Sequence, residues 1–119
     1  MKIIISKDYT DTPGGRYRNE GPYSGEDFRE TLLEPKYIEC LSKHEKLTID
    51  FDGSFGYSDS FLDEAFGGLA RKHDVNSVLN VLNYVSNDEL GLIEKVKKYI
   101  VNCNEERVLL WKNIKLDLL

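Results

Sequence analysis

The hydrophobic positions of this chain form short continuous runs, separated by segments with helical spacing. The runs at residues 1–6 and 47–51 predict buried strands, and a β-rich run at 78–85 predicts a third. Between the last two runs, apolar residues from Phe61 to Leu69 recur at the spacing of one helix face. Strands that alternate with helices predict a small α/β sandwich, with a mostly parallel sheet and helices packed against it.

Capping and breaking residues predict where other helices begin and end. Ser24 is suited to cap a helix whose first turn contains Asp27, and Asn87-Asp88 is suited to cap a longer helix over 90–100. Glu34-Pro35 is expected to break or kink the first of these helices, because proline has no amide hydrogen to donate. An apolar segment at 109–116 predicts a further helix that covers the sheet, with a final strand as the alternative.

The stretch from Ile49 to Arg71 joins a strand end, a glycine-rich turn and the start of the central helix. Such junctions are common places for binding sites in α/β proteins. Asp50 and Asp52 are expected on the same strand face, where they could bind a hard cation together with Asp59. Alternatively, Asp50 accepts backbone hydrogen bonds and Asp52 forms part of a turn.

The central helix raises two further questions. Ser60 is expected to be its N-cap, with Asp63 completing a capping box and with Ser58 and Asp59 as competing caps. Gly67-Gly68 lies inside the helix, where each glycine costs about 1 kcal/mol relative to alanine. Close packing of the helix on the sheet would explain the pair, and a ligand or partner backbone lying there is the alternative.

The segment Lys7–Tyr23 contains Pro-Gly-Gly and Gly-Pro, which predict a loop of about 15 residues. Loops of this length are often functional. Arg16 and Arg18 lie beside two glycines and could bind an anion. Alternatively, Arg16 forms an ion pair that pins the loop onto the central helix; the candidate acids are Glu26, Asp63 and Glu64.

Composition narrows the classes of function. The 119 residues predict a single domain over 1–119, and the net charge of -5 argues against nucleic acid held by a basic surface. No apolar run approaches the roughly 20 residues that cross a bilayer, and no signal peptide is recognisable, which predicts a cytoplasmic protein without a membrane partner. Cys40 and Cys103 are expected to be reduced thiols.

The pattern of reactive residues does not favour an enzyme. The histidines, His44 and His73, lie outside any ligand or triad pattern, and neither cysteine has a base nearby in the sequence. We therefore predict no catalytic residue, no metal and no cofactor.

Four motifs follow one another between Thr12 and Leu69, reading TPGGR, GPYSGEDFR, IDFDG and SFLDEAFGGL. In this order they resemble a STAS-like family of unknown function, which is distantly similar to bacterial anti-anti-sigma factors. In those proteins an Asp-Ser pair at a helix start is phosphorylated on the serine. Asp59-Ser60 resembles that pair, and Asp50 resembles the acidic residue at the strand end.

The resemblance implies a prokaryotic regulatory module that binds a protein partner, with a GHKL-type ATPase or kinase as the partner class. Ser60 is then the candidate phosphoacceptor, with Ser58 as the second candidate. The candidate residues for binding a partner or an anion are Arg16, Arg18, Asp50, Asp59, Asp63 and Glu64.

Two other functions remain open. The first is a sensor of a nucleotide or another anionic small molecule, which would use Arg16, Arg18 and the helix start at Ser60. The second, and least favoured, is a metal-dependent hydrolase or transferase with its carboxylates at Asp50, Asp52 and Glu64. The oligomeric state is also left open.

Overall fold

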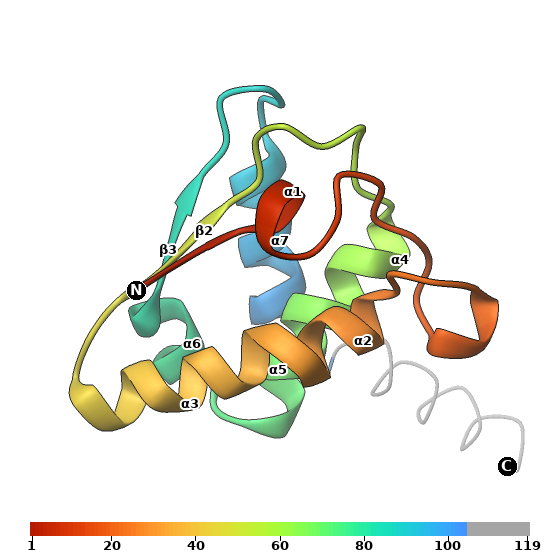
Figure 1. The fold of residues 1–119 in the computed structure, drawn as a ribbon. Coiled ribbons are helices and arrows are strands. Elements are labelled where there is room, and N and C mark those ends of the chain that lie inside the picture. The colour runs from red at the N-terminus through yellow and green to blue at the C-terminus, as the bar shows by residue number, and fades with distance from the viewer. Residues whose placement is uncertain (105–119) are drawn as a thin grey trace, which may run out of the picture.

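The computed structural model describes residues 1–104 and shows strands and helices in the expected alternating order (Figure 1). The strands are β1 (Lys2–Ile4), β2 (Leu47–Asp50) and β3 (Leu82–Val85). The α-helices are α1 (Ile5–Asp8), α2 (Gly25–Phe28), α3 (Glu34–Lys43), α4 (Asp59–Leu62), α5 (Gly68–Lys72), α6 (Val75–Val81) and α7 (Leu92–Val101). A 3₁₀ turn, η1 (Arg18–Glu20), and two π-helical segments, η2 (Arg29–Leu33) and η3 (Asp63–Gly67), complete the described elements.

The three strands form one parallel sheet in the order β1-β2-β3, which confirms the predicted α/β class and the mostly parallel sheet. The register aligns Ile3, Ile49 and Tyr84 in one row across the sheet. Ile3 and Ile49 are fully buried beneath the helices, whereas Thr48 and Asp50, which point to the opposite face, are half-buried. The helices of the described region therefore cover one face of the sheet.

Two long helical segments cross between the strands, and each is continuous through a π-helical turn. The first runs α2-η2-α3 and the second runs α4-η3-α5 (Figure 1). The expected break at Glu34-Pro35 does not occur: Glu34 keeps helical dihedral angles, and Pro35 lies in the first turn of α3. The wider π-turn immediately before Pro35 accommodates the missing amide hydrogen without ending the helix.

The boundaries of two strands differ from the sequence-based expectations. The first strand ends at Ile4, because Ile5 already begins the helical turn α1. The strand expected over 78–85 comprises only Leu82–Val85, because the residues before it form α6. Val78 and Val81 are buried on one face of this helix. Asp74 caps the helix by accepting a hydrogen bond from the Ser77 amide. Helical spacing here overrides the β propensity of valine.

The last described helix begins later than expected. Gly91 is the N-cap of α7, with a φ of 83°, and the buried positions are Leu92, Val96 and Ile100. Asn87-Asp88 lies upstream and contacts the loop after β2 instead. The predicted helix at 109–116 lies outside the described residues, and none of the helices that are described is long and apolar enough to span a membrane.

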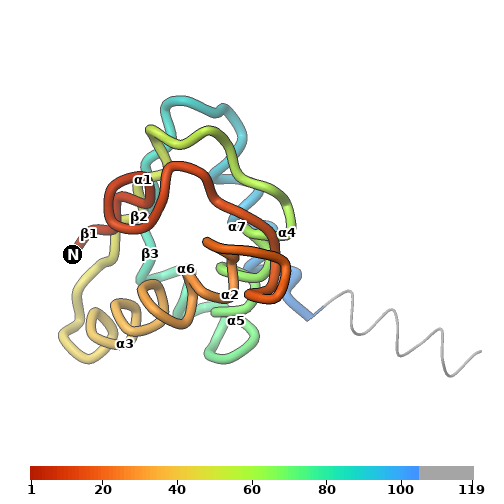
Figure 2. Tube along the Cα trace, turned by 45° about the vertical axis from the view of Figure 1, so that its right-hand side comes forward, coloured from red at the N-terminus to blue at the C-terminus, as the bar shows by residue number. Residues whose placement is uncertain are grey.

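The loops that follow the strands gather at one edge of the sheet, which we call the carboxyl edge. It comprises the loop 51–58 after β2 and the loop 86–91 after β3, with α1 beside them (Figures 1 and 2). The long loop 9–24 runs from this edge past α4 to α2 (Figure 2). All three strands are parallel, so their carboxyl ends meet where binding sites form in α/β sheets.

Candidate functional site

The start of the central helix is organised around Ser58 rather than Ser60. The Ser58 hydroxyl accepts a hydrogen bond from the Phe61 amide at 3.1 Å and donates to the Gly14 carbonyl at 3.0 Å. Ser58 is therefore the N-cap, and the expectation that Ser60 caps the helix is wrong. Three serine and aspartate residues occur in succession here, and propensity alone does not choose among them.

Ser60 lies in the first helical turn, half-buried, and its hydroxyl makes no hydrogen bond within residues 1–104. Its neighbour Asp59 is exposed and forms an ion pair with Lys95 of α7 at 3.2 Å. The hydrogen bond from Lys95 lowers the pKa of the Asp59 carboxyl. Both predicted phosphoacceptors thus lie at this helix start, but only the Ser60 hydroxyl is uncommitted among the described residues.

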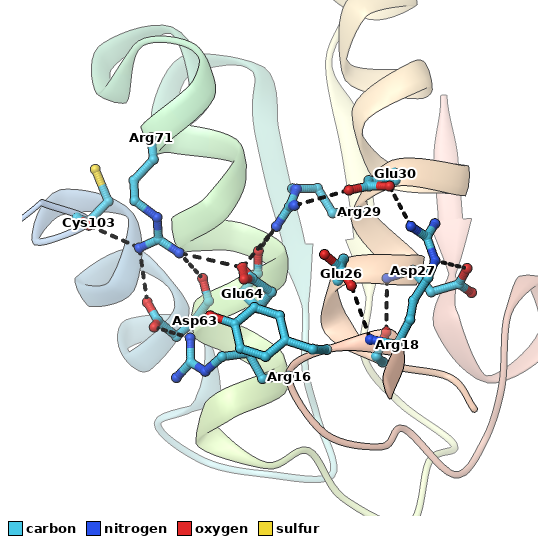
Figure 3. Close-up of polar contacts among 12 residues, drawn as sticks. Arg16, Arg18, Glu26, Asp27, Arg29, Glu30, Asp63, Glu64, Arg71 and Cys103 are labelled. Carbon is cyan, nitrogen blue, oxygen red and sulfur yellow. Dashed lines mark hydrogen bonds and ion pairs between the residues drawn. The ribbon is translucent and has the colours of Figure 1, made fainter. Parts of the chain in front are cut away.

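Arg16 holds the long loop against the central helix. Its guanidinium contacts the Asp63 carboxylate at 2.6 Å (Figure 3). Backbone hydrogen bonds from Gly25 to the Gly15 carbonyl and from Glu26 to the Arg16 carbonyl fix the other side of the loop to α2. This arrangement matches the loop-pinning alternative, with Asp63 as the acid.

Arg18 binds the same loop to the first long helix. It contacts Asp27 at 3.1 Å and Glu30 at 2.6 Å, while its backbone amide donates to Glu26 at 3.0 Å (Figure 3). Ser24 caps α2 as expected, accepting from the Asp27 amide at 3.0 Å. The Asp27 side chain, however, accepts from Tyr9 and Arg18 and so ties the loop to the helix.

Arg29 and Glu64 form a buried ion pair between the two long helices. Their side chains are 6% and 10% exposed, and the guanidinium contacts the Glu64 carboxylate at 3.1 Å. The same nitrogen donates to the Glu64 backbone carbonyl (Figure 3). Arg29 begins one π-turn and Glu64 lies in the other, so both helices are locally widened where they meet.

Arg71 extends this network toward the C-terminal helix. It lies 3.5 Å from Asp63 and 3.8 Å from Glu64, and it donates to the Cys103 carbonyl at 2.9 Å (Figure 3). We call the ion pairs of Arg16, Arg18, Arg29 and Arg71 with Asp27, Glu30, Asp63 and Glu64 the arginine network. Each guanidinium already faces a carboxylate of this chain, which leaves little positive charge to attract an anionic ligand.

The arginine network also explains the glycines inside the central helix. A Cβ at Gly68 would lie only 2.2 Å from the Arg29 guanidinium, and one at Gly67 would lie 2.7 Å from Asp63 and 3.2 Å from the Tyr99 carbonyl of α7. Gly67-Gly68 therefore accommodates arginine side chains and a neighbouring helix. The expected packing of these glycines on the sheet is not what excludes a side chain.

Asp50 and Asp52 do not act together at the strand end. Asp50 accepts from the Asp52 amide at 2.9 Å and lies 3.6 Å from Lys2. Asp52 instead accepts from the Asn87 and Asp88 amides at 2.7 and 3.0 Å and from the Asn87 side chain at 2.9 Å. The amide of Asp88, followed by those of Asn87, lowers the pKa of the Asp52 carboxyl.

The geometry of the acidic residues bears on the metal-site alternative. Asp59, at the start of the central helix, is paired with Lys95 of α7. Asp52 instead accepts hydrogen bonds from the loop 86–91. Within residues 1–104, no group of three or more histidine, cysteine, aspartate or glutamate side chains is arranged to bind a metal ion. The structure matches the alternative given for the strand end: Asp50 accepts a backbone hydrogen bond, and Asp52 lies in a turn.

The carboxyl edge has a cavity that sequence reasoning missed. It has a volume of about 280 Å³ and lies between the loops 51–58 and 86–91, with lining residues that include Phe51, Tyr57, Asp88 and Glu89. Phe55, which also lines it, is 86% exposed, and Leu90 on the neighbouring loop is 96% exposed. Gly53 and Gly56, both with positive φ, enclose Ser54-Phe55 in the turn, and this pair of glycines around an aromatic residue was the available signal.

A family model described as a STAS-like domain of unknown function matches residues 24–91, more than half of the chain. The match includes the central strand, the whole central helix and the loop 86–91, and it starts at the end of the long loop 9–24. No curated protein and no solved structure matches the chain.

The buried ion pair makes a testable contribution to stability. Glu64→Leu should lower the free energy of unfolding by about 3–5 kcal/mol, because it removes the carboxylate nearest the buried Arg29 guanidinium and leaves only Glu30, at 3.6 Å. Arg29→Met/Glu64→Leu should lose much less than the sum of the two single changes. Urea denaturation of the four proteins measures this coupling, and additive losses would contradict it.

Arg16 should govern the mobility of the long loop rather than global stability. Arg16→Gln removes the contact with Asp63, so the protected amides of Gly14 and Gly25 should exchange about fivefold faster, equivalent to about 1 kcal/mol. Hydrogen exchange followed by NMR measures this effect. Lys98→Gln, at an exposed position on α7, is the control; equal protection in both variants would mean that the loop is held without Arg16.

Proposed function

Because the chain belongs to the family of STAS-like domains of unknown function, we propose that it is a regulatory protein-interaction module that binds its partner through the carboxyl edge. One observation carries the proposal: Phe55 and Leu90, 86% and 96% exposed, project from the two loops that flank the cavity. Large apolar side chains that are exposed together beside a cavity are typical of interaction surfaces.

The loops that present these side chains are held in place before any partner binds. Asp52 accepts three hydrogen bonds from Asn87 and Asp88, and Asp88 in turn accepts one from the Gly53 amide at 2.9 Å. The amide of Phe55 donates to the Asp11 carbonyl at 2.8 Å, which ties the loop 51–58 to the long loop. A preorganised surface loses less conformational entropy on binding, so its exposed side chains contribute more to affinity.

The partner class that we propose is a GHKL-type ATPase or kinase in the cytoplasm, as the resemblance to anti-anti-sigma factors implies. The proposal includes no catalytic step. The arginines of the site are occupied by carboxylates of the chain, which makes an anion sensor the weaker alternative.

Phosphorylation of Ser60 is the switch that we propose for this docking. The Ser58 hydroxyl both caps the helix and binds the Gly14 carbonyl, so modifying it would remove two contacts. Ser60 has no such commitment among the described residues and lies in the first turn of a long helical segment, where the helix dipole favours negative charge. Asp59 and Asp63 oppose a phosphate there, so its addition would disturb the helix start and the Arg16–Asp63 contact.

Docking through the carboxyl edge can be tested at Phe55. A photo-crosslinking amino acid placed at position 55 in native cells should capture a partner that mass spectrometry identifies as a GHKL-type ATPase. Phe55→Ser should then weaken binding of the purified partner by about tenfold or more, because burial of a phenylalanine contributes about 1.5–3 kcal/mol. Isothermal titration calorimetry measures the dissociation constants.

The matched control is Ile38→Ser, which removes a half-exposed apolar side chain from α3, away from the carboxyl edge. It should leave the dissociation constant unchanged. Equal effects of the two substitutions, or no effect of Phe55→Ser, would contradict docking at this edge.

The switch has its own test. Incubation with the purified ATPase and ATP should add a phosphate to Ser60, detected by mass spectrometry, and Ser60→Asp should weaken partner binding by about tenfold, because it introduces a like charge beside Asp59 and Asp63. Ser42→Asp, on the exposed surface of α3, is the control. Absence of phosphate on both Ser58 and Ser60, together with unchanged binding by Ser60→Asp, would rule out the switch while leaving the docking proposal intact.

A further inference from the structure

The cavity at the carboxyl edge carries information about the chemistry of the partner. It lies between the loops 51–58 and 86–91, and its volume is about 280 Å³. These loops follow β2 and β3 (Figure 1). A single side chain of a partner fits into a space of this size. The lining residues are Phe51, Ser54, Phe55, Gly56, Tyr57, Ser86, Asp88, Glu89 and Leu92.

The charged side chains that line the cavity are all acidic. Asp88 and Glu89 line it, and no basic side chain is among its lining residues. The Glu89 carboxylate forms no ion pair within residues 1–104, and Asp52, directly behind the loop 86–91, adds a third negative charge. The hydrogen bonds to Asp52 lower the pKa of its carboxyl, which stays ionised at neutral pH. A positively charged group would be attracted here, and an anion would be repelled.

Part of the remaining wall is aromatic, alongside the hydroxyls of Ser54 and Ser86. The rings of Phe51 and Tyr57 meet edge to face, with centroids 5.3 Å apart, and the Tyr57 hydroxyl donates to the Phe51 carbonyl at 2.8 Å. Burial raises the pKa of Tyr57 to about 12, so the phenol adds no charge at neutral pH. Aromatic faces attract cations and also pack against the methylene stems of lysine and arginine. Phe55 and Leu90 provide apolar contacts on either side of the opening.

We propose that this cavity binds a lysine or arginine side chain from a partner segment in which apolar residues flank the basic one. The basic head group lies against Asp88 and Glu89, its stem lies along the aromatic wall, and the flanking apolar side chains cover Phe55 and Leu90. This inference rests on the proposed docking function and adds the chemistry of the segment that docks.

The test uses two capped tripeptides as probes, acetyl-Leu-Arg-Leu-amide and its isosteric neutral control acetyl-Leu-citrulline-Leu-amide. Each is titrated to millimolar concentration into the ¹⁵N-labelled protein and followed by NMR. The arginine peptide should shift the amide signals of Gly56, Glu89 and Leu92 saturably and bind at least about threefold more tightly than the citrulline peptide, with a difference that shrinks at raised salt.

Glu89→Gln removes one charge from the cavity without changing its shape and should lower the affinity for the arginine peptide by about threefold. Glu45→Gln, at an exposed acidic position outside the cavity, should leave its affinity unchanged. Equal affinity for the two peptides, signal shifts away from the cavity, or no saturable shift would each overturn the inference.

The outcomes also separate this inference from the docking function. If a partner depends on Phe55 while Glu89→Gln and raised salt leave its affinity unchanged, the docking function stands and the cation inference fails. If the arginine peptide binds in the cavity while Phe55→Ser leaves the affinity for the partner unchanged, the cavity is cation-selective and the proposed docking function fails.

Discussion

The buried contact between Arg29 and Glu64 is the constraint on which the arrangement of the helices depends. A guanidinium enclosed between two helices needs a carboxylate and a backbone carbonyl within reach, and Glu64 supplies both. It also needs space, which Gly68 leaves open because any side chain there would collide with it. Burial of the two charges costs free energy, but the pair can form in only one relative position of the two helices and so defines how they pack. The π-turns at Arg29 and at Asp63–Gly67 lie at this meeting point.

The same contact determines where the candidate site residues around the start of the central helix lie. With the central helix fixed, Asp63 faces the long loop and accepts Arg16, and Ser58 reaches the Gly14 carbonyl. The loop is thereby fastened at two points along the start of the helix, and Arg18 fastens it to α2. A long segment without regular structure becomes a fixed part of the surface around Ser60, so its arginines serve chiefly to shape the site.

The sequence predicted well those features that depend on local patterns. The order of strands and helices and the cap at Ser24 follow from apolar spacing and capping chemistry, which short segments contain by themselves. The cap at Ser58 could not be chosen over Ser60, because the bond to the Gly14 carbonyl that favours it comes from a distant part of the chain. Val78 and Val81 were assigned to a strand for the same reason: only the packing of α6 shows that helical spacing prevails.

The distribution of charge separates the part of the site that stabilises the fold from the part that is available to a partner. In the arginine network four guanidiniums face four carboxylates, so the motif residues Arg16, Arg29, Asp63 and Glu64 neutralise one another. At the carboxyl edge the carboxylates of Asp88 and Glu89 lie beside an open cavity that no basic lining residue neutralises, next to two exposed apolar side chains. Unbalanced charge and exposed apolar area both favour association, and they coincide at this edge. The motifs therefore identify the scaffold, and the loops 51–58 and 86–91 carry the features that would select a partner.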